Sequence, residues 1–185
     1  MSRILIAYGT SYGQTARIVS RMADRMTAGG HQVTVWRADL LAAEPTLTGF
    51  DRCVVAGSVL FGKHQTYLRR FVREHASALN QISSAFVSVC GAAASGRDDG
   101  QAEARKYVER FLHDTGWRPE MTRSFAGGVA YTRYGLFTRW MMKLISRRTG
   151  GPTDTSRDWE FTDWAEVDRF AEQVAPPLVP AVSAG

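Results

Sequence analysis

The chain has 185 residues, a formal net charge of +5 and a hydrophobic fraction of 44%. This length fits one domain with its own core, and no apolar run approaches the roughly 20 residues that a membrane-spanning helix needs. The first four residues, Met-Ser-Arg-Ile, lead directly into a strand pattern, so we expect no signal peptide.

Cysteine and histidine spacing favours neither a disulfide nor a metal site. Cys53 and Cys90, the only cysteines, each lie next to an apolar strand pattern, which is typical of buried, reduced thiols. The four histidines are not spaced as metal ligands (His31, His64, His75, His113). We therefore expect two free thiols in a cytoplasmic protein without a bound metal.

The first fifteen residues combine a buried strand with a loop that is suited to an anion. Arg3–Tyr8 is apolar after its arginine, which predicts the strand. Gly9–Thr15 follows, and the next residue begins a helical pattern, so unpaired N–H groups and the positive end of a helix dipole face this loop. Hydroxyls at Thr10, Ser11 and Thr15 add donors. A turn that only caps the helix is the alternative, but it needs fewer hydroxyls.

The loop matches neither of two common nucleotide-binding patterns. The chain lacks G-x-x-x-x-G-K-[ST], and the first turn lacks G-x-G-x-x-G. Because Gly9–Gln14 contains no lysine or arginine, neutral donors would bind the anion. We therefore expect the phosphate monoester of a firmly held prosthetic group rather than a phosphate that is transferred.

Strand and helix patterns alternate along the rest of the chain. The first helix ends at Gly29–Gly30. Strands are predicted at 32–36, 51–57, 84–90 and 122–129, and helices at 65–79, 102–115 and 163–175, the last with Asp163 and Glu166 as a capping box. This alternation predicts an α/β fold with a doubly wound, five-stranded parallel sheet. We place one domain at 1–175 and a disordered tail at 176–185.

Three loops at the predicted carboxyl ends of strands are rich in glycine and small residues. They are Gly9–Gln14, Gly57–Gly62 and Gly91–Gly96. In open parallel sheets, ligands bind beyond these ends, where the strand order reverses. We therefore expect the three loops to converge on one ligand.

A long insert, about 130–161, separates the fifth predicted strand from the last helix. Its middle, Tyr131–Arg148, has two distinct faces when it is placed on a helix. The apolar half consists of Leu136, Phe137, Trp140, Met141, Leu144 and Ile145, and the other half of Arg139, Lys143, Ser146 and Arg147. A basic amphipathic helix with tryptophan and phenylalanine suits an anionic membrane surface. The alternative is a helix that packs on the domain and whose charges are only solvated.

The first loop resembles the phosphate loop of flavodoxins, usually T-x-[ST]-G-x-T. Tyr12 stands where that pattern has serine or threonine. The resemblance implies a flavodoxin-like fold that binds flavin mononucleotide (FMN) at the carboxyl edge of the sheet. The implied phosphate contacts are Thr10, Ser11, Tyr12, Gly13, Gln14 and Thr15. The implied neighbours of the flavin ring are Ser58, Val59, Leu60, Phe61 and Gly62, then Gly91, Ala92, Ala93 and Ala94, with Phe61 or Tyr12 either stacking on the ring or packing on other loop residues.

Other segments resemble the flavodoxin-like protoporphyrinogen oxidases of bacteria. They span nearly the whole chain: Gly57–His64, Phe71–His75, Ser84–Ser88, Trp117–Pro119, Ala130–Tyr134, Met142–Ile145, Gly150–Thr155 and Phe161–Trp164. This resemblance implies FMN-dependent oxidation of protoporphyrinogen IX to protoporphyrin IX. It also implies that electrons pass to menaquinone or ubiquinone and that the protein is peripheral, at the cytoplasmic face of the inner membrane.

Individual side chains can be given hypothetical roles under this resemblance. Arginines of the insert are candidates for pairing with the substrate propionates, and the same side chains could instead bind lipid headgroups or water. The candidate substrate or membrane contacts are Arg133, Arg139, Trp140, Lys143, Arg147 and Arg148. His64 is a candidate proton acceptor, with a surface or hydrogen-bonding histidine as the alternative.

Three other functions compete with this interpretation. A flavodoxin-type electron carrier would be acidic and would lack the insert, and an NAD(P)H:quinone reductase would need a nicotinamide site that no motif indicates. A flavin-free module that binds membrane or nucleic acid through its arginines would not need the three loops. We expect no nucleic-acid partner, and the sequence leaves open which quinone is used and how many copies associate.

Overall fold

The computed structural model describes residues 1–39, 43–95, 98–149 and 151–178. Its central sheet contains five parallel strands in the order β2-β1-β3-β5-β6. They are β1 (Arg3–Gly9), β2 (Gln32–Arg37), β3 (Arg52–Leu60), β5 (Ser83–Cys90) and β6 (Met121–Ala126). The strand order reverses between β1 and β3, so a crevice for a ligand is expected at their carboxyl ends. The prediction of a doubly wound, five-stranded parallel sheet is confirmed.

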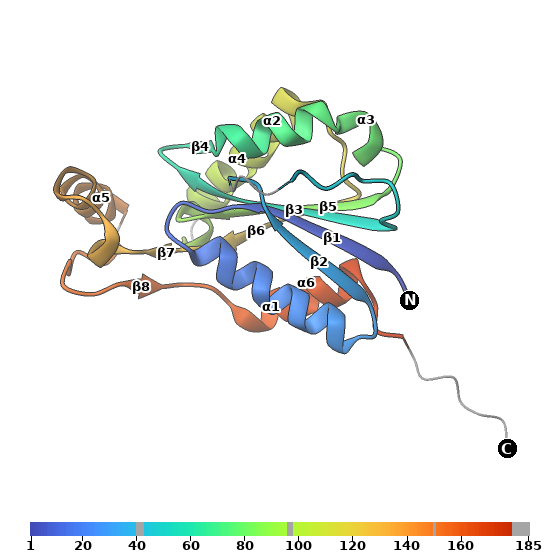
Figure 1. Cartoon of the computed structure of the whole chain (residues 1–185). Coiled ribbons are helices and arrows are strands. Elements are labelled where there is room, and N and C mark those ends of the chain that lie inside the picture. The colour runs from blue at the N-terminus through green and yellow to red at the C-terminus, as the bar shows by residue number, and fades with distance from the viewer. Residues whose placement is uncertain (40–42, 96–97, 150, 179–185) are drawn as a thin grey trace, which may run out of the picture.

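Helices cover both faces of the sheet (Figure 1). On one face lie α1 (Gln14–Ala28) and α6 (Trp164–Val174), whose apolar residues pack on alternate side chains of β1, β3 and β5. On the other face lie α2 (Thr66–Glu74), α3 (Ala76–Leu79) and α4 (Asp98–Thr115), packed on the side chains that point the opposite way. One half of the predicted capping box is present, because Asp163 Oδ1 accepts from the N–H of Glu166 at 3.0 Å, whereas the Glu166 carboxylate pairs with Arg123 at 3.4 Å. Cys53 and Cys90 are buried, free thiols.

Several predicted boundaries differ from the structure; the helix predicted at 102–115, for example, begins at Asp98. The helix predicted at 65–79 is divided at His75 into α2 and α3. The third strand does not end at Gly57 but runs to Leu60, because it pairs with a short antiparallel strand, β4 (Lys63–His64). The fifth strand stops at Ala126, and Gly128–Val129 forms a separate strand, β7, in another sheet.

The tail predicted from residue 176 begins later in the structure. His31 Nε2 lies 2.9 Å from the carbonyl oxygen of Pro176, and the N–H of Leu178 donates to the carbonyl of Gly29 at 2.9 Å. Residues 176–178 therefore pack against the end of α1, and the prediction of a disordered tail is wrong for them. The remainder of the predicted tail, 179–185, lies outside the described residues.

The insert forms a small unit of its own beyond the carboxyl edge of the sheet (Figure 1). Its stem is a two-stranded antiparallel ribbon of β7 and β8 (Trp159–Glu160). Its outer part holds the 3-10 turn η2 (Tyr131–Arg133) and the helix α5 (Leu136–Thr149). Val129, Tyr131 and Tyr134 form a small apolar core beneath α5, against which Met142 packs. Across the described ranges, no helix combines the length and hydropathy that crossing a membrane requires.

Candidate functional site

The loop after β1 has the backbone shape expected of a phosphate loop. Gly13 has a φ of 95°, a left-handed conformation that glycine adopts without strain. Its N–H donates to Thr10 Oγ1 at 2.9 Å, and α1 begins at the next residue without a side-chain cap. The amino end of α1 therefore has no side-chain cap of its own and faces the switch point between β1 and β3.

A buried hydroxyl lies unpaired in this loop. Thr15 is fully buried, and within the described part of the chain its Oγ1 has no hydrogen-bond partner. An unpaired buried hydroxyl is costly, so a ligand that accepts from it is favoured. No acidic side chain occurs in residues 9–15. The loop therefore combines hydroxyl donors at Thr10, Ser11 and Thr15 with no negative charge, a donor set that fits a terminal phosphate.

The second loop meets the first at the switch point. The N–H of Ser11 donates to Ser58 Oγ at 3.1 Å, and Gln65 Nε2 donates to the hydroxyls of both serines. These bonds join the loop after β1 to the end of β3, as the sequence predicted for two of the three loops. Gln65 was missed by sequence reasoning, because nothing in its local pattern distinguishes it from a surface residue at a helix start.

The segment 58–62 is a hairpin rather than an irregular loop. β3 continues through Leu60, and Phe61 and Gly62 form a two-residue turn with φ values of 50° and 76° before β4. A left-handed aromatic residue costs about 1–2 kcal/mol, so the ladder between β3 and β4 must hold it there. The Phe61 side chain is 54% exposed at the tip of this hairpin. Its predicted stacking on a flavin ring stays a prediction.

The third loop is only partly described. Gly91 faces open space, since a Cβ there would meet nothing within 4 Å, and Ala92–Ala94 form the 3-10 turn η1. Ala93 and Ala94 line a hollow of about 600 Å³ between α4 and β6, and no residue of the first two loops lines it. Residue 96, the end of the predicted loop, lies outside the described residues. Cys90 next to this loop is buried, and burial raises the pKa of its thiol.

His64 does not lie where a proton acceptor for a substrate is needed. Its ring is buried between Phe86 and Phe111, and its Nε2 lies 3.0 Å from Ser88 Oγ. Burial, aided by the positive charge of Arg69, lowers the pKa of the imidazole from 6.5 to about 3. The ring is therefore a neutral core group. The prediction that it accepts a proton is corrected, and the alternative of a hydrogen-bonding histidine describes it.

The arginines of the insert occupy three different environments. Arg133 is exposed and donates from Nη1 to the carbonyl of Tyr12 at 3.0 Å, which places it on the phosphate loop. Arg139 donates to the carbonyls of Tyr131 and Tyr134 and thereby holds the η2 turn against α5, a structural role that the sequence did not predict. Lys143 and Arg147 are exposed, and the side chain of Arg148 lies outside the described part.

The helix α5 presents its apolar residues outward. Leu136, Phe137 and Trp140 are 84%, 71% and 63% exposed, and Leu144 and Ile145 are also exposed. The face that packs on the insert carries Arg139, Met142 and the buried Ser146, whose hydroxyl lies 3.0 Å from that of Tyr131. The predicted apolar half of α5 therefore faces outward and does not pack on the domain. The predicted polar half is divided, because Arg139 and Ser146 face the insert whereas Lys143 and Arg147 are exposed.

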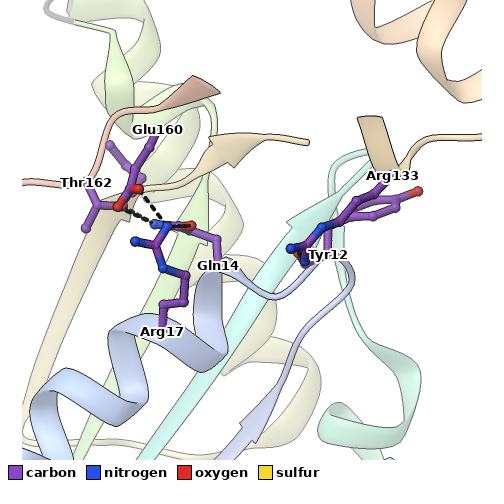
Figure 2. A network of polar contacts seen from close by, with 7 residues as sticks. Tyr12, Gln14, Arg17, Arg133, Glu160 and Thr162 are labelled. Atoms are coloured by element: carbon purple, nitrogen blue, oxygen red, sulfur yellow. Dashed lines mark hydrogen bonds and ion pairs between the residues drawn. The ribbon is translucent and has the colours of Figure 1, made fainter. Parts of the chain in front are cut away.

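A polar network between the phosphate loop and the insert stem was not predicted (Figure 2). Gln14 Nε2 donates to Thr162 Oγ1 at 2.8 Å and to Glu160 Oε1 at 3.1 Å. Arg17 pairs with Glu160 at 2.6 Å, and its guanidinium lies over the ring of Trp164. Burial raises the pKa of the Glu160 carboxyl, but hydrogen bonds from Arg17 and Gln14 outweigh this effect and hold the pKa below its ordinary value. Residues about 145 positions apart in sequence thus lie side by side.

Comparison with known proteins agrees with this geometry. Residues 5–156 match the flavodoxin domain family, to which the chain therefore belongs. Flavodoxin 1 of Bacillus cereus superposes with a TM-score of 0.54 at 12% identity, over 96% of this chain and all of that one. The flavodoxin-like fold is thereby confirmed.

Closer relatives define the branch of the family. The chain is 34% identical over 173 residues to protoporphyrinogen IX dehydrogenase [quinone] of Escherichia coli K12, with 94% of each chain covered. It is 30% identical over 184 residues to the protein of the same name in Leishmania major, covering 96% of this chain and 78% of that one. The resemblance stated from sequence is confirmed, and the chain belongs to the family of these dehydrogenases.

The buried His64 predicts a specific acid sensitivity. An unfolded chain binds a proton at this imidazole below pH 6.5, whereas its lowered pKa of about 3 keeps it neutral in the folded state. The free energy of unfolding should therefore fall by up to about 1.4 kcal/mol for each pH unit as the pH is lowered from 6.5 towards 3. Urea unfolding of His64→Gln at pH 7 and pH 5 should show a smaller loss than the wild type. His113→Gln, at an exposed histidine, is the control, and equal losses in all three proteins contradict the assignment.

Proposed function

We propose that this protein oxidises protoporphyrinogen IX to protoporphyrin IX with a bound FMN and passes the electrons to a membrane quinone. The observation that carries the proposal is the identity of 34% across 94% of the chain with a relative of that name, a span that takes in most of the insert. The enzyme would be an oxidoreductase of haem biosynthesis. Menaquinone and ubiquinone are the candidate acceptors.

The cofactor is proposed to be FMN because the first loop fits a terminal phosphate. Gly13 turns the backbone, α1 supplies its uncapped amino end, and the Thr15 hydroxyl is a buried donor without a partner in the described residues. FMN, when bound, would accept hydride or electrons from the substrate. The residues of this chain would hold its phosphate and place its ring between the hairpin at Phe61 and the loop at Gly91.

The outward apolar face of α5 supports a peripheral attachment to an anionic membrane. Three large apolar side chains on this helix are more than 60% exposed, and the exposed Lys143 and Arg147 lie on the same helix. Such a helix lies in the interface with its apolar side chains among the acyl chains and its cations at the headgroups. The quinone is apolar and the porphyrinogen combines a large apolar macrocycle with two propionates, so this placement would bring the carboxyl edge of the sheet to both. We propose the cytoplasmic face of the inner membrane as the location.

The first prediction from the proposed function concerns Thr15 and the identity of the flavin. Heating the purified protein should release FMN. Thr15→Val, which keeps the side-chain shape, should weaken FMN binding to the flavin-free protein about tenfold or more, because a hydrogen bond to a charged group is lost. The flavin-free variant should be as stable as the wild type, since the valine leaves no unpaired hydroxyl. Thr27→Val at the exposed end of α1 is the control; an unchanged FMN dissociation constant for Thr15→Val contradicts the phosphate loop.

The second prediction concerns the reaction. Under anaerobic conditions, the protein with protoporphyrinogen IX and menaquinone should produce fluorescent porphyrin and consume quinone in parallel. Without quinone, each flavin can accept only two of the six electrons that the oxidation releases, so porphyrin should not exceed about one third of the flavin present. Quinone consumption with NADH and no porphyrinogen would instead favour the reductase. The absence of both reactions would favour an electron carrier.

The third prediction concerns α5. The wild type should sediment with vesicles that contain anionic lipid, and the double variant Phe137→Ser/Trp140→Ser should lose most of this binding. Lys143→Glu/Arg147→Glu should lose it as well, and high salt should reproduce that loss. Val35→Ser, at an exposed apolar residue of β2, is the matched control. Equal sedimentation of all four proteins rejects membrane attachment through this helix.

A further inference from the structure

The insert holds the phosphate loop from both sides of Gly13 (Figure 2). Before the glycine, Arg133 Nη1 donates to the carbonyl of Tyr12, and the ring of Tyr12 packs edge-on against Tyr134 with 4.5 Å between centroids. After the glycine, Gln14 donates to Glu160 and Thr162 of the insert stem. The two positions of the loop that flank Gly13 are therefore occupied by contacts with the insert.

Arg133 lies directly over the turn. A Cβ on Gly13 would stand 3.1 Å from Arg133 Nη1, so the guanidinium fills the space that a side chain at that position would take. Within the ranges that the structure describes, no carboxylate forms an ion pair with this arginine. Two other arginines near the stem do form ion pairs: Arg17 pairs with Glu160, and Arg157 pairs with Asp154. The charge of Arg133 is therefore not balanced by a described neighbour.

The sequence predicted a phosphate site made only of neutral donors, and the fold changes that prediction. Positive charge arrives from a residue that is about 120 positions away in sequence from the loop that it contacts. The one acidic side chain that reaches Gln14, Glu160, is paired with Arg17. A phosphate dianion at the amino end of α1 would thus meet a net positive field.

We propose that the insert is part of the cofactor site: Arg133 attracts the flavin phosphate, and the docking of the insert stem on Gln14 and Arg17 is thermodynamically coupled to phosphate binding. This proposal rests on the proposed binding of FMN. Coupling between two events is reciprocal, so phosphate binding also stabilises the docked insert. Through that coupling, flavin loading would set the position of α5 beside the carboxyl edge of the sheet.

Comparison of FMN with riboflavin, which lacks the phosphate, tests the role of Arg133. The full chain, stripped of flavin, is titrated with each flavin while flavin fluorescence is followed. Arg133→Gln should weaken FMN binding about fivefold to tenfold and leave riboflavin binding nearly unchanged. Arg133→Lys should restore most of the loss, because it keeps the charge. Arg157→Gln, on the same insert, should match the wild type for both flavins.

Two results would overturn the role of Arg133. One is an unchanged FMN dissociation constant in Arg133→Gln, and the other is an equal loss for FMN and riboflavin, which would mean that the side chain acts on the site in general and not on the phosphate. Failure of the wild type to bind FMN at all would instead reject the proposed function.

Hydrogen exchange on the wild type tests the coupling without any variant. Saturating FMN should slow the exchange of backbone amides in peptides that cover 128–134 and 159–162 more than saturating riboflavin does. Peptides from α3, on the other side of the sheet, should respond equally to both flavins. Equal protection of the stem by FMN and riboflavin would overturn the coupling.

Discussion

The left-handed turn at Gly13 is the constraint on which the rest of the site depends. β1 is buried and α1 packs on the same sheet, so the chain must turn from strand to helix within a few residues. A φ of 95° at Gly13 achieves this turn and starts α1 without a side-chain cap. The amino end of the helix then faces the place where the strand order reverses. An anion at that place pairs with donors that the protein does not satisfy itself, including the Thr15 hydroxyl.

Features that depend on neighbours in sequence were predictable. The apolar runs at β1 and β5 predicted buried strands because a strand covered on both faces needs no polar alternation. Asp163 predicted the start of α6, because a carboxylate at that position pairs with an N–H three residues later. The turn from β1 into α1 was predictable for the same reason, since strand, glycine, hydroxyls and helix follow one another directly. The strand order was not predicted, because α/β alternation is compatible with more than one order of parallel strands.

Features that depend on distant partners were not predictable in this way. His64 is of a residue type that often transfers protons, and it follows the Gly57–Gly62 segment in sequence. In the structure, however, strand β4 turns its ring inward onto Phe86 and Phe111. Gln14 was assigned to the cofactor because it lies in the loop, whereas its amide donates to Glu160 and Thr162. No local sequence pattern predicts these hydrogen bonds, because the insert stem must first fold back onto the loop before Gln14 and Glu160 come within reach of each other. Sequence therefore identifies the site and the fold determines its electrostatics.

The orientation of α5 is the clearest case in which pattern and packing disagree. A helical pattern alone says that one side is apolar, and the usual inference is that this side is buried. Here the buried side carries Arg139 and Ser146, because the η2 turn offers carbonyls to the guanidinium and the Tyr131 hydroxyl to the serine. Because these polar groups take up the side of α5 that faces the insert, the side chains of Leu136, Phe137 and Trp140 stay mostly exposed to solvent. An exposed apolar surface of this kind is costly in water, which supports the proposal that it contacts an apolar partner outside the domain. Under the proposed coupling, the docking of the stem on the loop after β1 would tie the position of that surface to the cofactor site, so that membrane attachment and flavin binding would depend on the same contacts.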